Sequence, residues 1–217
     1  LSDRASAPPA DSDTRTARPP DDPRHRVRRD ARLSGRHQHL LSVKEPTVTL
    51  TRTQSGVGHL GVEAVCSPSV GDLRLGVAYQ LRSGGSGIVQ HADGHRFGPS
   101  ARRPVVAAAH EEYERVGIDL RQIYDIERLA VYAYSESRAE LTWGGTLVVE
   151  LFGGGRIELP LETLHAGRVA VLLSLYNMDG EIVVRAEMET VAGDIREAAR
   201  AYGYDRITWR DERSPVD

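Results

Sequence analysis

The stretch from residue 141 to residue 210 constrains the fold most strongly, because its apolar runs alternate with a period of two between clear turns. In the run Thr146 to Phe152, the side chains of Leu147, Val149 and Leu151 all point to one side. Three consecutive glycines, 153–155, then interrupt the run, and the alternation resumes as far as Pro160. Glycines between two alternating runs supply the positive φ angles of a tight turn. We therefore expect a β-hairpin here.

The next run, Arg168 to Tyr176, is apolar on both faces, which predicts a central strand that is covered on both sides. We expect Val169, Val171, Leu173 and Leu175 to share one of these faces. Asn177-Met178-Asp179-Gly180 has the composition of a turn, and a second alternating run begins at Ile182. This pattern predicts a second hairpin.

From Val191 onward the apolar spacing becomes helical, with acidic residues in the early turns, arginines later and Gly203 as the stop. Residues 205–209 could add a last strand. Three further alternating stretches come earlier, at Thr47–Thr51, Val57–Cys66 and Gly71–Leu81, the last with one face in the core and the other outside it. Together these elements predict an all-β fold, a two-sheet β-sandwich with one short C-terminal helix.

Residues 1–42 differ in composition from the rest of the chain. They contain paired prolines, scattered aspartates and arginines, and almost no large apolar residue, so we expect a disordered tail followed by one domain at 43–213. Nine arginines and six aspartates give residues 1–40 a net charge of +3, which leaves −6 for the remainder. The basic run at 24–29 has no neighbouring aromatic to stack on a base, so no nucleic-acid partner is expected.

The cysteine content and the hydropathy of the sequence indicate the cellular compartment of the protein. Cys66 is the only cysteine, which excludes an internal disulfide and every cysteine-based zinc motif. No apolar run reaches the roughly 18 residues of a membrane span, and no apolar leader begins the sequence. These features predict a cytoplasmic protein without a membrane span.

The stretch GDLRLGVAYQLRSGGSGIVQHADGHRFG at 71–98 resembles the opening of the tellurium-resistance TerD-like family, in which a D-L-D-L-G strand leads through a turn to a G-V-V-Q strand and an F-G pair. The likeness continues through VGIDL, IERLAVYAYSES, VVELFGGGRIELPL and VAGDIREAARAYGY, and covers roughly residues 43–210. The resemblance implies a β-sandwich with a calcium site in acidic loops. It also implies a non-enzymatic role in a bacterial stress response, as a binding or scaffold protein with protein partners.

The candidate metal ligands implied by this resemblance are Asp72, Glu111 and Glu112. Arg74 stands where the family's second strand acid is expected, and Ala107–Ala109 begin the segment where its second acidic loop is expected. Calcium takes six to eight oxygen ligands, so we expect a degraded site that binds calcium weakly, and we assign no firm cofactor. We further expect the Arg74 guanidinium to pair with Asp72 or with a loop glutamate.

Other readings stay open. A sandwich domain of this kind could instead bind a carbohydrate or another small ligand near Trp143. Glu111, Glu112 and Glu114 could form a carboxylate site, although a charged run before a strand is usually solvated. His91, Asp93 and His95 alternate like metal ligands on a strand, although Asp93-Gly94 is a turn signature. Cys66 reads as a small apolar residue rather than a nucleophile.

Overall fold

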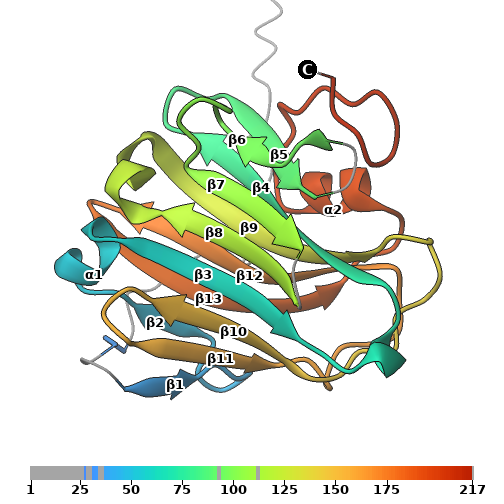
Figure 1. The fold of residues 1–217 in the computed structure, drawn as a ribbon, viewed down its shortest axis with the longest axis horizontal. Helices are drawn as coiled ribbons and strands as arrows, with labels where there is room; N and C mark the ends of the chain where they lie inside the picture. Colours follow the sequence, from blue (N-terminus) through green and yellow to red (C-terminus); the bar gives the residue numbers. More distant parts are fainter. Residues whose placement is uncertain (1–26, 28–30, 34–36, 92–93, 111–112, 217) are drawn as a thin grey trace, which may run out of the picture.

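The structure, a computed structural model, describes residues 27, 31–33, 37–91, 94–110 and 113–216. In this part of the chain two β-sheets overlie one another (Figure 1). The first sheet has the strand order β1-β11-β10-β3-β8-β7-β6, in which only β1 and β11 pair in parallel. Its strands are β1 (Gln38–Leu40), β11 (Arg156–Pro160), β10 (Thr146–Leu151), β3 (His59–Val65), β8 (Glu114–Asp119), β7 (Val106–His110) and β6 (Phe97–Gly98).

The second sheet has the order β2-β13-β12-β9-β4-β5, and all its neighbours are antiparallel. Its strands are β2 (Thr47–Thr49), β13 (Glu181–Thr190), β12 (Val169–Met178), β9 (Ile126–Ser135), β4 (Leu73–Leu81) and β5 (Ser86–Gln90). Its longest strands, β9, β12 and β13, each have ten residues and lie next to one another. They form the centre of the fold.

The helices are short and well capped. The α-helices are α1 (Arg52–Gly56) and α2 (Ile195–Ala201), and the 3₁₀ helices are η2 (Pro68–Val70) and η4 (Leu120–Asp125). α2 begins with a capping box, in which Asp194 caps the first turn and the Glu197 carboxylate accepts from the Asp194 backbone N–H. This reciprocal pair explains why the predicted helix starts where it does. None of the helices in the described part has the length and apolarity that a bilayer crossing requires.

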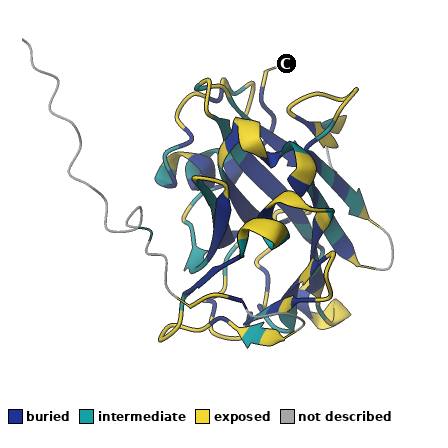
Figure 2. Cartoon of the chain, turned by 90° about the vertical axis from the view of Figure 1, so that its left-hand side faces the viewer, coloured by how far each residue is buried: buried dark blue, intermediate teal, exposed yellow. Residues whose placement is uncertain are grey.

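Two hydrophobic clusters hold the layers together. The larger cluster lies between the sheets, and its members include Leu60, Leu75 and Leu173. The smaller one lies on the outer face of the second sheet, where α2 and the segment after it cover Tyr132, Tyr134 and their neighbours. Figure 2 shows buried residues along the strands and exposed ones mainly in the loops. The predicted all-β, two-sheet fold with a short C-terminal helix is confirmed.

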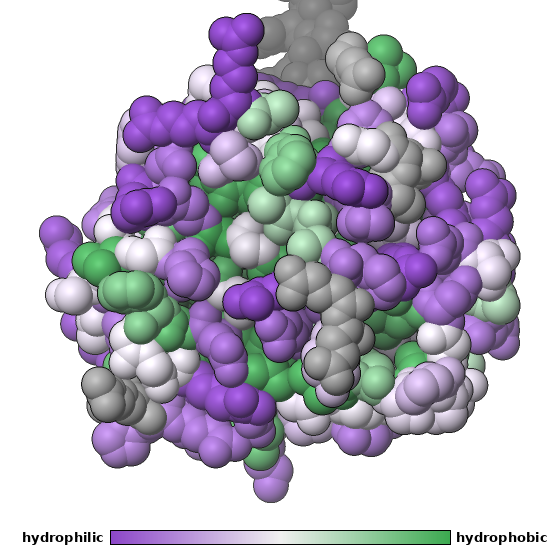
Figure 3. Space-filling model, in the orientation of Figure 1, coloured by the Kyte–Doolittle hydropathy of each residue, from purple (hydrophilic) through white to green (hydrophobic). Residues whose placement is uncertain are grey.

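The outward face of the first sheet carries charged side chains that pair across the strands. Arg115 of β8 lies 3.3 Å from Glu63 of β3, and Arg156 of β11 lies 3.3 Å from Glu150 of β10. Such pairs face solvent, where each contributes about 0.2–1 kcal/mol. Figure 3 shows this face as mostly hydrophilic, with hydrophobic side chains visible in the gaps.

Both predicted hairpins are present. β10 and β11 are antiparallel neighbours joined by the glycine turn, in which Gly154 has a φ of 83°. β12 and β13 are joined at Asp179 and Gly180, whose φ angles are 55° and 83°. Asn177 closes this turn by accepting a hydrogen bond from the Gly180 N–H. β12 is a central strand between β13 and β9, as its apolar character on both faces predicted.

The prediction that Val169, Val171, Leu173 and Leu175 share one face of β12 is wrong. Its pairing registers shift between Val171 and Leu173, both toward β9 and toward β13. This irregularity inverts the alternation, so that Leu173 and Leu175 enter the core between the sheets while Val169 and Val171 pack toward α2. β13 carries a related distortion, since Met188 adopts the left-handed conformation with a φ of 51°.

The folded domain extends beyond both of the limits predicted from composition, residues 43 and 213. Within the predicted tail, β1 pairs with β11, Leu33 and Leu41 are buried in the core, and the Leu33 N–H donates to the Thr49 carbonyl. The tail prediction is therefore wrong for 31–33 and 37–42, whereas 1–26, 28–30 and 34–36 lie outside the described residues. At the other end Ser214, beyond the predicted limit of 213, is also buried.

Two smaller predictions also need correction. The possible last strand at 205–209 is not formed, because only Trp209 makes an isolated bridge, to Pro215. The outer face of β4 was expected to lie outside the core, but Ala78 on this face is buried in the cluster beneath α2. A sandwich pattern alone does not reveal that a helix covers one sheet.

Candidate functional site

Asp72 lies immediately before β4 and is held by the last residue of β9 and by the segment that follows. Its carboxylate accepts hydrogen bonds from the Ser135 hydroxyl, at 2.8 Å, and from the Ser137 backbone N–H. Partial burial alone would raise the pKa of Asp72, but these hydrogen bonds outweigh it and hold the pKa below the usual value. Asp72 is therefore an ionised carboxylate whose oxygens already have protein partners.

Arg74, two residues further along β4, joins two glutamates. Its Nη1 donates to Glu114 Oε1 at 3.0 Å, while its Nε and Nη2 donate to Glu136 Oε2 at 2.9 and 2.6 Å. Burial by itself would lower the pKa of Arg74, but the hydrogen bonds and charges of Glu136 and Glu114 more than compensate and raise it. The guanidinium thus stays charged between two carboxylates.

Glu114 is the buried member of this group, with a side chain only 4% exposed. Its second carboxylate oxygen accepts from the Leu75 backbone N–H at 3.1 Å, and its first also contacts His110 Nδ1. A buried carboxylate is tolerated only when charges and hydrogen-bond donors surround it. We call Arg74, His110, Glu114 and Glu136 the Arg74 cluster.

Arg74 pairs with two glutamates that are not the predicted loop residues, namely Glu114 at the start of β8 and Glu136 after β9. The carboxylate of Asp72, the other predicted partner, bonds to Ser135 and Ser137 instead. The predicted ligands Glu111 and Glu112 lie outside the described residues, in the connection between β7 and β8. The alanines expected to begin a loop belong instead to β7, which pairs with β8 as far as the His110 and Glu114 positions. They contribute methyl groups and no side-chain oxygen ligand.

The described part of the chain does not bring together a set of ligands for a metal ion. No group of three or more His, Cys, Asp or Glu side chains there could hold a metal ion. His91 lies against the Arg74 cluster, with its ring centroid 5.9 Å from that of His110. Asp93, the middle residue of the alternating His-Asp-His pattern, lies outside the described residues.

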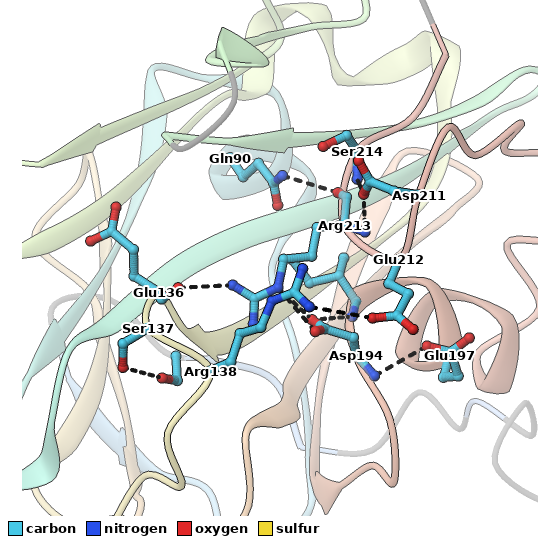
Figure 4. Close-up of polar contacts among 12 residues, drawn as sticks. Gln90, Glu136, Ser137, Arg138, Asp194, Glu197, Asp211, Glu212, Arg213 and Ser214 are labelled. Atoms are coloured by element: carbon cyan, nitrogen blue, oxygen red, sulfur yellow. Dashed lines mark hydrogen bonds and ion pairs between the residues drawn. The ribbon is translucent and has the colours of Figure 1, made fainter.

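A second ionic group joins α2 to the C-terminal segment (Figure 4). Arg213 Nε donates to both carboxylate oxygens of Asp194, at 2.9 and 3.0 Å, and Arg213 Nη1 donates to the Glu136 carbonyl at 3.1 Å. The guanidinium also lies 5.6 Å from the ring centroid of Tyr134, within the range of a cation–π contact. Sequence reasoning placed Asp194 at the start of the helix but missed Arg213 as its partner.

Glu136 connects the two ionic groups. Its carboxylate binds Arg74, and its backbone carbonyl binds Arg213. Figure 4 also shows Gln90, which donates to the Arg213 carbonyl, and Arg138, which lies 3.6 Å from Glu212. The loop after β9 therefore holds both the start of β4 and the C-terminal segment.

Two other residues considered from the sequence are poor candidates for chemistry. Burial, followed by the charge of Glu162, raises the pKa of the Cys66 thiol to about 11, so the thiolate is scarce near neutral pH. Trp143 is only 7% exposed and packs in the core between the sheets. Its ring is therefore not presented to a ligand.

Comparison with known proteins assigns no family to this arrangement. No protein-family model matches the chain, and no curated protein matches it in sequence.

Proposed function

We propose that the chain is a non-enzymatic binding or scaffold protein of the TerD-like type, which acts in a bacterial stress response through protein partners in the cytoplasm. In this proposal the calcium site of the resembling family has been replaced by an internal ion-pair network. The order of the strands and of the C-terminal helix supports it, since each quoted string of the resemblance falls on an element of the sandwich.

The observation that carries the proposal is the position of Arg74 between Glu114 and Glu136. The guanidinium satisfies carboxylate oxygens that would otherwise be open to a cation, and it does so with charge-assisted hydrogen bonds of 2.6–3.0 Å. Its positive charge also repels calcium at short range. The protein would therefore hold the geometry of this end of the sandwich without a metal.

Calorimetric titration with calcium tests this proposal. We expect the unmodified protein to bind calcium in the millimolar range or not at all. Arg74→Asp should strengthen binding only in part, because the alanines of β7 still offer no side-chain oxygens and calcium takes six to eight ligands. Arg52→Asp, at an exposed arginine of α1, makes the same change of two charge units at another site and is the matched control. Micromolar affinity of the unmodified protein would overturn the proposal.

The alternative function, binding of a carbohydrate or other small ligand, loses its expected aromatic contact because Trp143 is buried. One observation supports a function in binding a small ligand. An apolar pocket opens at the edge of the sandwich, and Trp143 is not among the residues that line it.

A further inference from the structure

This pocket, which we call the edge pocket, lies where one edge of each sheet meets the other. Its volume is about 560 Å³, within the range of about 300–1,000 Å³ that is typical of small-molecule sites. Its lining comes from the end of β1 and the chain between β1 and β2, from the end of β11 and the segment after it, and from the middle of β13.

The pocket exists because the edge strand of the second sheet is short. β2 pairs with Val183–Arg185, and the chain just before β2 adds a hydrogen bond from the Ala186 N–H to the Pro46 carbonyl, at 2.7 Å. Beyond it, no described strand pairs with the outer edge of β13. Met188, which lines the pocket, is held in the left-handed conformation where β13 departs from regular pairing. The sandwich is therefore open along this edge.

The interior of the pocket is apolar and continuous with the core. Leu41 and Leu159 are fully buried members of the main cluster, and Ala186 and Met188 pack against it while still facing the pocket. At the mouth, Leu40 is 53% exposed and Val43 is 89% exposed. Adjacent apolar side chains exposed beside a hollow are typical of a binding site. Methionine also adapts its shape readily to a guest.

The exposed charge of the lining favours an anion. Arg185 Nη1 and Glu187 Oε2 lie 3.8 Å apart and largely offset one another, and their side chains are only 20% and 3% exposed. Lys44, the only lysine in the sequence, is exposed at the mouth and leaves the lining with one net positive charge. A ligand that matches this surface has an apolar body for the interior and a negative group for Lys44.

We propose that the edge pocket binds a single-chain amphiphile with an anionic head, of the fatty-carboxylate class. The alkyl chain occupies the space between β11 and β13, and the carboxylate lies at the Lys44 ammonium group. This site is independent of the Arg74 cluster and of the calcium argument.

Calorimetric titration of the full chain with octanoate, nonanoate and decanoate, each below its micellar concentration, tests the proposal. If each added methylene is buried, it should tighten binding about fourfold, which corresponds to about 0.8 kcal/mol. Decanoate should also bind more tightly than decanol, by about two- to fivefold, since an exposed ion pair contributes that much. Lys44→Gln should abolish the difference between decanoate and decanol and leave the melting temperature unchanged.

A blocking variant separates this pocket from unspecific apolar binding. Thr163 is exposed and lines the mouth, so Thr163→Trp should weaken decanoate binding at least tenfold without entering the core. The matched control is Thr53→Trp, at an exposed threonine in α1, which should bind decanoate like the unmodified protein. Equal affinities of these two variants would overturn the proposal. So would an affinity that does not depend on chain length, or binding to phospholipid vesicles without binding to the free carboxylates.

Discussion

Replacing Arg74 by methionine tests whether the Arg74 cluster is an ion pair on which the fold depends. The substitution keeps much of the apolar stem and leaves Glu114 buried without its guanidinium partner. Breaking a fully buried ion pair costs about 3–5 kcal/mol. Arg74 is 22% exposed, and His110 and the Leu75 N–H still contact Glu114. We therefore expect a loss of about 2 kcal/mol in the free energy of unfolding, below the range for a fully buried pair.

The assay is urea denaturation of four proteins: the unmodified chain, Arg74→Met, Glu114→Gln and the double variant. Glutamine keeps an acceptor for the Leu75 N–H and carries no charge, so the double variant should recover about half of the stability lost in Arg74→Met. Because this domain is large, 2 kcal/mol corresponds to a fall of about 4–8 °C in melting temperature.

The reasoning is refuted if Arg74→Met costs less than about 0.5 kcal/mol, the usual size of a surface substitution. It is also refuted if the double variant is no more stable than Arg74→Met.

Three further outcomes are expected. Leu173→Ala should lower the free energy of unfolding by about 2–5 kcal/mol in urea denaturation, because Leu173 is fully buried between the sheets; a cost below 1 kcal/mol would contradict its placement. A chain that begins at Val43 loses Leu33 and Leu41 from the core, so calorimetry should show a lower melting temperature than for the full chain. Alkylation of Cys66 by iodoacetamide should be slow at pH 8 and accelerate toward pH 11, where its thiol ionises; fast reaction at pH 7 would contradict this.

Local patterns predicted the parts of the fold that depend on neighbours in sequence. The hairpin at Gly153–Gly155 and the turn at Asp179-Gly180 follow from the conformations that these residues adopt readily. The capping residues Asp194 and Glu197 stand three positions apart and mark the start of α2. In each case the interaction spans only a few residues.

Long-range pairing accounts for the features that sequence reasoning missed. β1 is ordered because it pairs with β11, more than 100 positions later, and nothing in its three residues indicates this partner. The register shift at Leu172 depends on how β12 fits two different neighbours at once, whereas an alternation rule assumes uniform pairing. The tail-like composition was therefore misleading for β1, and the regular period of two was misleading for β12.

The candidate site was predictable only where a resemblance supplied the partner. Arg74 was a candidate because the resembling family has an acid at this position. That an arginine there pairs with a carboxylate could be predicted from its charge. Glu136 was missed, although β4 and β9 pair so that Leu73 lies opposite Ser135. Once that register is known, the carboxylate directly after β9 falls beside Arg74. The missing information was the strand order and not the residue type.

The double role of Glu136 also separates the stability of the fold from the chemistry of the Arg74 cluster. Its side chain binds Arg74, but its backbone carbonyl binds Arg213, which in turn holds the Asp194 cap of α2. A substitution at Arg74 frees the carboxylate and leaves the carbonyl in place, because the backbone of this loop is also fixed by the hydrogen bond from the Glu136 N–H to the Asp72 carbonyl. The C-terminal segment should therefore stay docked in Arg74→Asp. A change in calcium affinity in that variant then reports on the freed carboxylates themselves and not on a rearranged C-terminus.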